Sequence, residues 1–294
     1  MQGGGKEFIM YQFPIGVILE SFRTGRSEAI KKASNMGAKG IQMYATQGEN
    51  APENLSASAR SELKNEVLES GLIFSALCGD LGMGFGNKEL NPSLIEKSKR
   101  IVDLAKDLGT DIVTTHIGVV PSDKSADRYK IMQEACFELA SYADSVDAHF
   151  AIETGPETSE VLKEFLDSLG STGVAVNLDP ANFRMVTGDD PVKAVYNLKK
   201  YIVHTHAKDG VKLLESNPEY IYRVVHPIPR EIESMKFFEE VPLGTGSVDF
   251  PNYLKALEEI GYKGFLTIER EVGENPEKDI KTAFDFLNKT IAEN

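Results

Sequence analysis

The sequence of 294 residues predicts one (β/α)₈ TIM barrel, an α/β fold. Short β-like apolar runs alternate with longer helical patterns from Phe13 onward, which is typical of a parallel sheet covered by helices. Eight such pairs follow one another, more than an open doubly wound sheet usually has, and one barrel of ordinary size uses nearly the whole chain. No GxGxxG follows the first run, so a dinucleotide-binding fold gets no support.

Each predicted pair joins a short apolar run to a helical pattern. The first four are FPIGVIL with SEAIKKASNMG, KGIQMY with ENLSASARSELKNEVLESG, LIFSALC with NPSLIEKSKRIVDLAKDLG, and DIVTTHIG with a helix over residues 127–147. The last four are HFAIET with TSEVLKEFLDSLG, VAVNLD with DPVKAVYNLKKY, IVHTHAKD with DFPNYLKALEEIG, and GFLTIE with NPEKDIKTAFDFLNKTIAEN. Several helices stop at glycine, as at Gly109, where a left-handed C-cap costs little. Asn91 before Pro92 and Asp190 before Pro191 are predicted N-caps.

Residues 1–12 are expected to be disordered or loosely attached, and residues 13–294 to form the single barrel. A long irregular insertion at about 210–245 separates strand seven from its helix. Loops of this length in a compact domain are usually functional, and this one leaves the face where barrel enzymes do their chemistry. Its tyrosines and arginines suit hydroxyl and anion contacts, so we expect a lid over the substrate or an oligomer interface.

Charge and composition limit the partners. The net charge of −13 and pI near 5.0 oppose a nucleic acid partner, because that binding depends on Lys and Arg neutralising phosphate. Cys78 and Cys136 lie in apolar surroundings and are expected to be buried, reduced thiols. No apolar stretch reaches the ~18 residues of a membrane span, and the first residues lack a signal-peptide apolar region. The sequence thus predicts a cytoplasmic protein without a membrane partner.

Four strand ends carry a polar residue that could bind a metal. They belong to HFAIETG, VAVNLDP, IVHTHAKD and GFLTIER, and the residues are Glu153, Asp179, His206 and Glu269. Strand alternation puts Glu153, Asp179 and Glu269 on the face opposite their apolar neighbours, and it puts His206 on one face with His204 and Lys208, so all four line the barrel interior near its top. Three carboxylates and one imidazole suit one divalent ion, Mn²⁺, Mg²⁺, Co²⁺ or Zn²⁺, and a cation would let like charges converge.

Other polar residues carry a weaker signal. Taken alone, His116, His204, Asn177 or Asn182 is more often a hydrogen-bonded structural group than a ligand. The set of four differs because buried Glu and Asp are rare unless they are paired or bound to metal. The four residues together therefore predict a metalloenzyme.

The segments AIETG, NLDPAN, HTHAKD, LTIER and LGTGSVDFP resemble the xylose isomerase-like barrel superfamily, in its branch of sugar (phosphate) isomerases and epimerases. The resemblance covers essentially the whole barrel. It implies that Glu153, Asp179, His206 and Glu269 hold one divalent metal ion. It also implies that Glu153 and Glu269 are catalytic, one removing a proton beside the carbonyl of a keto sugar and the other returning it on the far side.

The chemistry agrees with the resemblance, since a metal on the carbonyl and adjacent hydroxyl would stabilise an enediolate, and a carboxylate at its edge can act as general base. Five residues are expected to bind substrate: Gln42, His116, Asn182, His204 and Lys208. Many relatives carry Glu at the position of Gln42, Arg near Lys208 and His at the position of Asn182.

Other functions stay open at this point. An inosose dehydratase-like lyase would use the same metal and base and then expel a hydroxyl. An endonuclease IV-like phosphodiesterase shares the fold but needs several zinc ions and a basic groove. A non-catalytic sugar-binding barrel is a further alternative. The resemblance also implies a homodimer or homotetramer.

Overall fold

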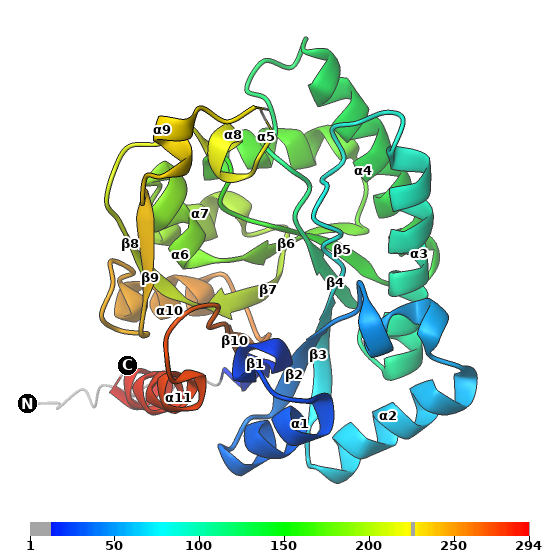
Figure 1. Ribbon diagram of the computed structural model, residues 1–294, viewed down its shortest axis with the longest axis vertical. Coiled ribbons are helices and arrows are strands. Elements are labelled where there is room, and N and C mark those ends of the chain that lie inside the picture. Colours follow the sequence, from blue (N-terminus) through cyan, green and yellow to red (C-terminus); the bar gives the residue numbers. More distant parts are fainter. Residues whose placement is uncertain (1–12, 225–226, 294) are drawn as a thin grey trace, which may run out of the picture.

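The structure, a computed structural model, describes residues 13–224 and 227–293. Eight parallel strands close into a barrel in the order β1-β10-β7-β6-β5-β4-β3-β2 (Figure 1). They are β1 (Ile15–Ile18), β2 (Gly40–Tyr44), β3 (Ile73–Cys78), β4 (Ile112–Thr115), β5 (His149–Glu153), β6 (Val174–Leu178), β7 (Ile202–Ala207) and β10 (Leu266–Ile268). The predicted barrel is confirmed, while the expectation for residues 1–12 lies outside the described residues.

Helices cover the outside of the barrel (Figure 1). The principal ones are α1 (Arg26–Asn35), α2 (Ala57–Glu69), α3 (Asn91–Leu108), α4 (Asp127–Ser145), α5 (Ser159–Leu169), α7 (Pro191–Leu198), α10 (Phe250–Glu259) and α11 (Pro276–Glu293). Each turns an apolar stripe inward, as α5 does with Leu162, Phe165, Leu166 and Leu169. No helix in the described part of the chain is long and apolar enough to cross a bilayer.

Of three predicted helix caps, the structure confirms two and contradicts one. Gly109 ends α3 in the left-handed conformation, and the Asp190 side chain accepts the backbone N–H of Val192 at the start of α7. The predicted cap at Asn91 is wrong, because Asn91 is already the first residue of α3. The Asn87 side chain instead accepts the N–H groups two and three residues after it. These bonds close the turn that precedes α3, and the helix itself begins at Asn91 without a side-chain cap.

The two ends of the barrel differ in what fills them. Phe265 fills the N-terminal end, where a Cβ atom at Gly40 would lie 2.5 Å from its ring. Glycine at this position lets strand and ring approach closely. Polar side chains gather toward the opposite end, where Glu153 of β5 is in register with Asn177 of β6. The candidate residues therefore share the C-terminal mouth, where barrel enzymes hold their active sites.

The insertion at 210–245 is more ordered than predicted. It contains the antiparallel pair β8 (Asp209–Lys212) and β9 (Phe238–Val241), and the short helices α8 (Pro218–Ile221) and α9 (Arg230–Glu233). Elements of four residues are too short for a reliable periodic signal, which is why the sequence reads as irregular. His226, part of the predicted lid, lies outside the described residues.

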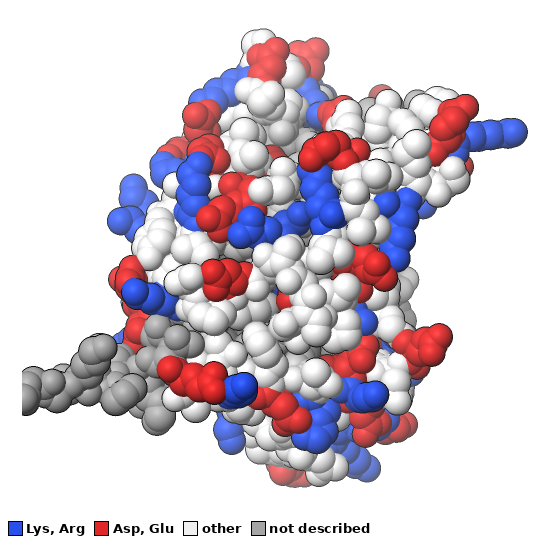
Figure 2. All heavy atoms as spheres, turned by 90° about the vertical axis from the view of Figure 1, so that its left-hand side faces the viewer, with Lys and Arg blue, Asp and Glu red and all other residues white. Residues whose placement is uncertain are grey.

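The face that carries β8 and β9 has a mixed charge. Figure 2 views the molecule from this side of Figure 1, and Lys and Arg are interspersed there with Asp and Glu over the described residues. A groove for nucleic acid would instead gather Lys and Arg along one continuous area.

Candidate metal centre

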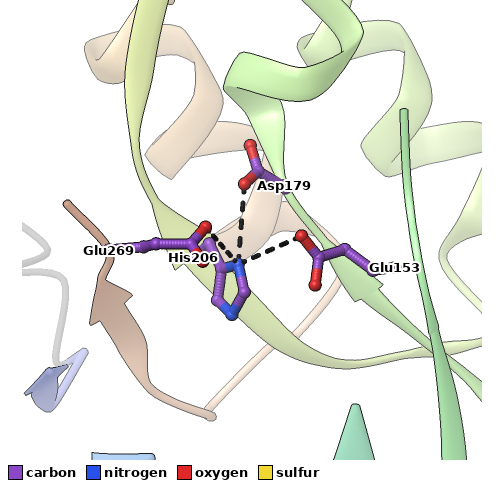
Figure 3. Close-up of side chains that lie close together, drawn as sticks. All are labelled: Glu153, Asp179, His206 and Glu269. Carbon is purple, nitrogen blue, oxygen red and sulfur yellow. Dashed lines mark ion pairs between the residues drawn. The ribbon is translucent and has the colours of Figure 1, made fainter. Parts of the chain in front are cut away.

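The four predicted residues meet at one point. Each offers one potential ligand atom, these atoms all lie within 4.8 Å of one another, and all four side chains are buried. His206 Nδ1 lies 3.1 Å from Glu269 Oε2, 3.5 Å from Asp179 Oδ2 and 3.6 Å from Glu153 Oε1. Figure 3 shows Glu153 and Glu269 on opposite sides of the imidazole, with Asp179 between them.

The residues present fit a divalent cation. Asp179 Oδ2 and His206 Nδ1 are buried and have no hydrogen-bond partner. Buried polar atoms are nearly always hydrogen-bonded, so two such atoms 3.5 Å apart indicate a missing positive partner. Ligand atoms at these separations suit bonds of about 2.0–2.2 Å to a central ion. The cluster could therefore hold a metal.

The two carboxylate oxygens of Asp179, which precedes Pro180 after β6, make different contacts. Asp179 is the N-cap of the short helix α6 (Pro180–Asn182), where proline occupies the first turn. Its Oδ1 accepts the N–H groups of Ala181 at 2.8 Å and Asn182 at 2.9 Å. Because the helix holds Oδ1 in place, Oδ2 is left facing His206.

Gln42 of β2 supports the imidazole of His206. Its Oε1 lies 3.1 Å from His206 Nε2 and 3.0 Å from His204 Nε2, and its amide donates to Thr114 Oγ1. A metal at His206 Nδ1 requires the proton to be on Nε2. That nitrogen lies 3.1 Å from both Asn177 Nδ2, which can only donate, and Gln42 Oε1, which can accept the proton. Metal-bound histidines are commonly oriented by such an acceptor on the other ring nitrogen. We infer that Gln42 favours the metal-binding tautomer of His206.

This inference predicts different outcomes for two variants of Gln42. Gln42→Leu removes the acceptor and should weaken divalent-metal affinity by about 10–100-fold. Gln42→Glu keeps an acceptor oxygen and should retain affinity better than the leucine variant. Calorimetric titration of the apo protein measures both, with circular dichroism as the check on folding. Equal affinities in a folded leucine variant would contradict the role.

Glu153 is held by two amides. Asn182 Nδ2 donates to its Oε1 and Asn177 Nδ2 to its Oε2, both at 3.2 Å. Gly155 makes room for the first contact, because a Cβ atom there would lie 2.5 Å from Asn182 Cβ and the residue has φ +139°. Asn182 therefore lies at the predicted site, in contact with a cluster carboxylate.

Glu269 and Glu153 have different cationic neighbours. The buried Lys208 ammonium lies 3.1 Å from Glu269 Oε2, whereas His116 Nε2 lies 3.7 Å from Glu153 Oε1. Burial opposes ionisation of Glu269, but Lys208 and His206 outweigh it and hold its pKa well below the usual range. Burial also opposes ionisation of Glu153, yet His116 and His206 lower its pKa. Both glutamates are therefore carboxylates at neutral pH, the form that accepts a proton.

His116 directly follows β4 and lies at the cavity wall. Its Nδ1 is 3.3 Å from Asp80 Oδ2, and its ring centroid is 5.6 Å from that of Tyr222 in the insertion. Burial lowers the pKa of His116, but Glu153 and Asp80 outweigh it and raise the value to about 9. The sequence analysis missed Asp80, although it follows the apolar run of β3 as a strand-end carboxylate.

A cavity of about 620 Å³ opens above the cluster, a size that suits a small organic ligand. The predicted substrate-binding residues Gln42, His116, Asn182 and Lys208 line it. His204 is outside this wall, which corrects its expected place. Its imidazole is buried one step deeper, where it contacts Gln42 and Thr267, so a ligand above the cluster cannot reach it directly.

The chain is similar to known proteins over most of its length. A family model described as xylose isomerase-like TIM barrel matches residues 30–290. An uncharacterised protein of Methanocaldococcus jannaschii is 22% identical over 241 residues, which span 76% of this chain and 74% of that protein.

Three solved structures show the same fold. A xylose isomerase domain protein from Planctomyces limnophilus is 24% identical with a TM-score of 0.76, covering 95% of this chain and 96% of that one. A probable 3-DHS dehydratase from Bacillus anthracis is 19% identical with a TM-score of 0.71, covering 94% and 98%. A D-psicose 3-epimerase is 14% identical with a TM-score of 0.71, covering 95% and 99%. With the family model matching most of the chain, this protein belongs to the xylose isomerase-like TIM barrel family.

Proposed function

We propose that the protein is a metal-dependent isomerase or epimerase of a keto sugar or sugar derivative. Glu153, Asp179, His206 and Glu269 would hold the cation. When bound, a divalent ion would supply Lewis-acid polarisation of a carbonyl oxygen and its neighbouring hydroxyl. The observation that carries the proposal is the position of two buried glutamates on opposite sides of one cluster (Figure 3).

Opposed carboxylates suit proton transfer at a carbon beside a carbonyl. One glutamate accepts the proton, and the other, after taking up a proton from solvent, returns a proton to the opposite face and so inverts the carbon. The amides of Asn177 and Asn182 keep Glu153 in place, and Lys208 does the same for Glu269. Fixed side chains avoid reorganisation during the reaction, which is the usual source of efficient acid–base catalysis.

The direct test is solvent exchange at the carbon that would lose its proton. A panel of ketoses is incubated with the Mn²⁺-, Mg²⁺- or Co²⁺-loaded protein in D₂O, with Mg²⁺ used for the samples followed by proton NMR. We expect deuterium to enter one position beside the carbonyl, with a second sugar accumulating at equilibrium. Absence of exchange and of new products across the panel would contradict the proposed function.

A lyase is the second candidate, and Lys208 favours it. Its buried ammonium lies 3.1 Å from Glu269 and lines the cavity, so it could donate a proton to a departing hydroxyl group. One structural neighbour is named as a probable dehydratase. Product NMR separates the two reactions, because a lyase product has lost water and an isomerase product has the composition of its substrate.

Two further alternatives have less support. A phosphodiesterase with several zinc ions needs more ligands than the one group of potential ligands that the described residues bring together. The net charge of −13 and the mixed charge in Figure 2 also disfavour a DNA groove. A purely sugar-binding barrel would not need two buried glutamates on opposite sides of one cluster.

We also propose that residues 210–245 form a cover over the substrate. Tyr222 from this insertion lines the cavity, and Glu219 forms an ion pair with Arg128 of α4. Replacing residues 213–237 with a short Gly/Ser turn keeps the β8–β9 pair and should lower turnover by about 10²-fold or more, since water would then reach the reacting carbon. Metal content should stay unchanged. A truncated protein with native kinetics and native oligomeric state would contradict both the cover and the predicted oligomer interface.

A further inference from the structure

We propose that the substrate of this cavity is an uncharged polyhydroxy carbonyl compound, without a phosphate or carboxylate group. The inference rests on the proposed function and narrows its substrate class. It comes from three independent features: a glycine-rich loop whose amides are already occupied, cationic side chains that are already paired, and an excess of carboxylates around the cavity.

The loop LGTGSV before α10 has the form of an anion-binding loop. Successive backbone N–H groups in such turns bind phosphate, and barrel enzymes often hold phosphate after strands seven and eight. Here the carboxylate of Asp209 takes that place. It accepts the N–H groups of Gly210 at 2.9 Å, Gly244 at 3.1 Å, Gly246 at 2.8 Å and Val248 at 3.1 Å.

The Asp209 carboxylate also fills the space in this loop. A Cβ atom at Gly246 would lie 2.1 Å from Asp209 Oδ1, so the loop closes on the carboxylate at van der Waals contact. Asp209 is 1% exposed. A phosphate group could therefore not bind in this loop, because the backbone N–H groups already donate to Asp209 and no space is left. The Asp209 carboxylate would also repel it.

The lysines at the cavity are committed to carboxylates. Lys208 is bonded to Glu269 and Glu271, and Lys236 lies 3.0 Å from Glu239. An ammonium group between two carboxylates would have to give up one of them to hold a phosphate. Because Glu269 is buried, leaving it without Lys208 would cost free energy.

The arginine at the cavity is committed in the same way. Arg270 donates to Glu240 at 2.7 Å and to Asp279 at 2.8 Å, and it is 7% exposed. Among the described residues, these are the Lys and Arg side chains of the cavity wall, and each has a carboxylate partner. No buried side chain of this kind is left over to bind an anionic substituent, and Lys236 at the exposed rim, 62% exposed, has Glu239 as its partner.

The balance of charge points the same way. Six Asp or Glu residues line the cavity, against three Lys or Arg and His116, and a bound divalent ion would offset two of these carboxylates. A phosphate ester would therefore meet a carboxylate beside each Lys or Arg of the wall, and like charges in one desolvated site repel one another. Sugar hydroxyls can donate to carboxylates and accept from an amide or ammonium group, so the same wall suits an uncharged polyol.

Paired ligands test this inference without requiring turnover. Calorimetry of the Mg²⁺-loaded protein would compare D-fructose with D-fructose 6-phosphate, and D-glucitol with D-glucitol 6-phosphate. We expect each ester to bind about tenfold or more weakly than its free partner. Equal or tighter binding of the esters overturns the inference, and so does absence of binding by both members of both pairs. Solvent exchange tests the proposed function separately. Preferred binding of the free compounds without solvent exchange would support an uncharged ligand and contradict the isomerase or epimerase function.

A charge variant tests the physical cause. Glu271 is exposed and bonded to Lys208, so Glu271→Gln should preserve the fold while freeing part of that ammonium. The affinity for each ester should rise several-fold relative to its free partner. Glu274→Gln is the matched control, since it makes the same charge change in the same loop away from the cavity wall. An unchanged ratio in Glu271→Gln, or an equal rise in Glu274→Gln, would count against exclusion by cavity charge.

Discussion

Replacing either Glu153 or Glu269 with Gln should lower solvent exchange at the substrate carbon by about 10²–10⁴-fold. An amide has nearly the shape of the carboxylate but cannot accept the proton, so the effect should fall on kcat. The two variants should still bind substrate. NMR exchange rates, with metal content measured on the same samples, separate loss of the base from loss of the metal.

Glu157→Gln is the control for this experiment. Glu157 also follows β5 and is buried, and burial raises its pKa to about 8. Its neutral form predominates at pH 7, so the amide resembles the side chain already present. Its exchange rate should stay near that of the unmodified protein. A near-native rate in Glu153→Gln or Glu269→Gln would refute transfer by two bases.

Asp179→Asn should remove metal binding while the fold survives. The amide oxygen can keep accepting the N–H groups of Ala181 and Asn182, but the group facing His206 becomes a donor. Rotating the amide would restore the ligand only by losing the cap. Affinity should therefore fall by more than about 100-fold, beyond the effect of changing a residue that only supports a ligand.

Asp190→Asn controls for the capping role, because Asp190 also precedes a proline and caps α7, away from the cluster. Both variants should have similar stability without metal. The unmodified protein and Asp190→Asn should each gain about 2.7 kcal/mol of unfolding free energy at a metal concentration 100 times Kd, whereas Asp179→Asn should gain little. Full metal occupancy in Asp179→Asn would remove Asp179 from the ligand set.

The strand ends were predictable because side chains alternate along a strand. The structure brings the predicted ligand atoms within 4.8 Å of one another, as the alternation of side chains along each strand requires. They belong to Glu153, Asp179, His206 and Glu269. Their binding of metal stays a prediction. The cavity wall also includes four of the predicted substrate-binding residues, His116, Asn182, Lys208 and Gln42. The alternation of side chains alone could not distinguish them from His204.

Three expectations differ from the structure. Asn91 is not a cap, because the turn closed by Asn87 carries the chain directly into α3 and makes Asn91 its first residue. The insertion forms strands and helices of four residues each, which are too short to be predicted from a periodic pattern in the sequence. His204 shares parity with His206, but Gln42 and Thr267 hold it below the cavity.

The amino-acid sequence by itself determined the barrel and the strand ends that supply its polar residues, because both follow from short-range periodicity. Only the tertiary structure decided which partner each polar group meets. Gln42 and His206 are 164 residues apart in the chain, and Asp209 and Gly246 are 37 apart. Such contacts depend on how the closed barrel juxtaposes distant segments, and no local pattern encodes them. The acceptor that faces His206 Nε2 and the occupied glycine-rich loop therefore became visible only in the fold.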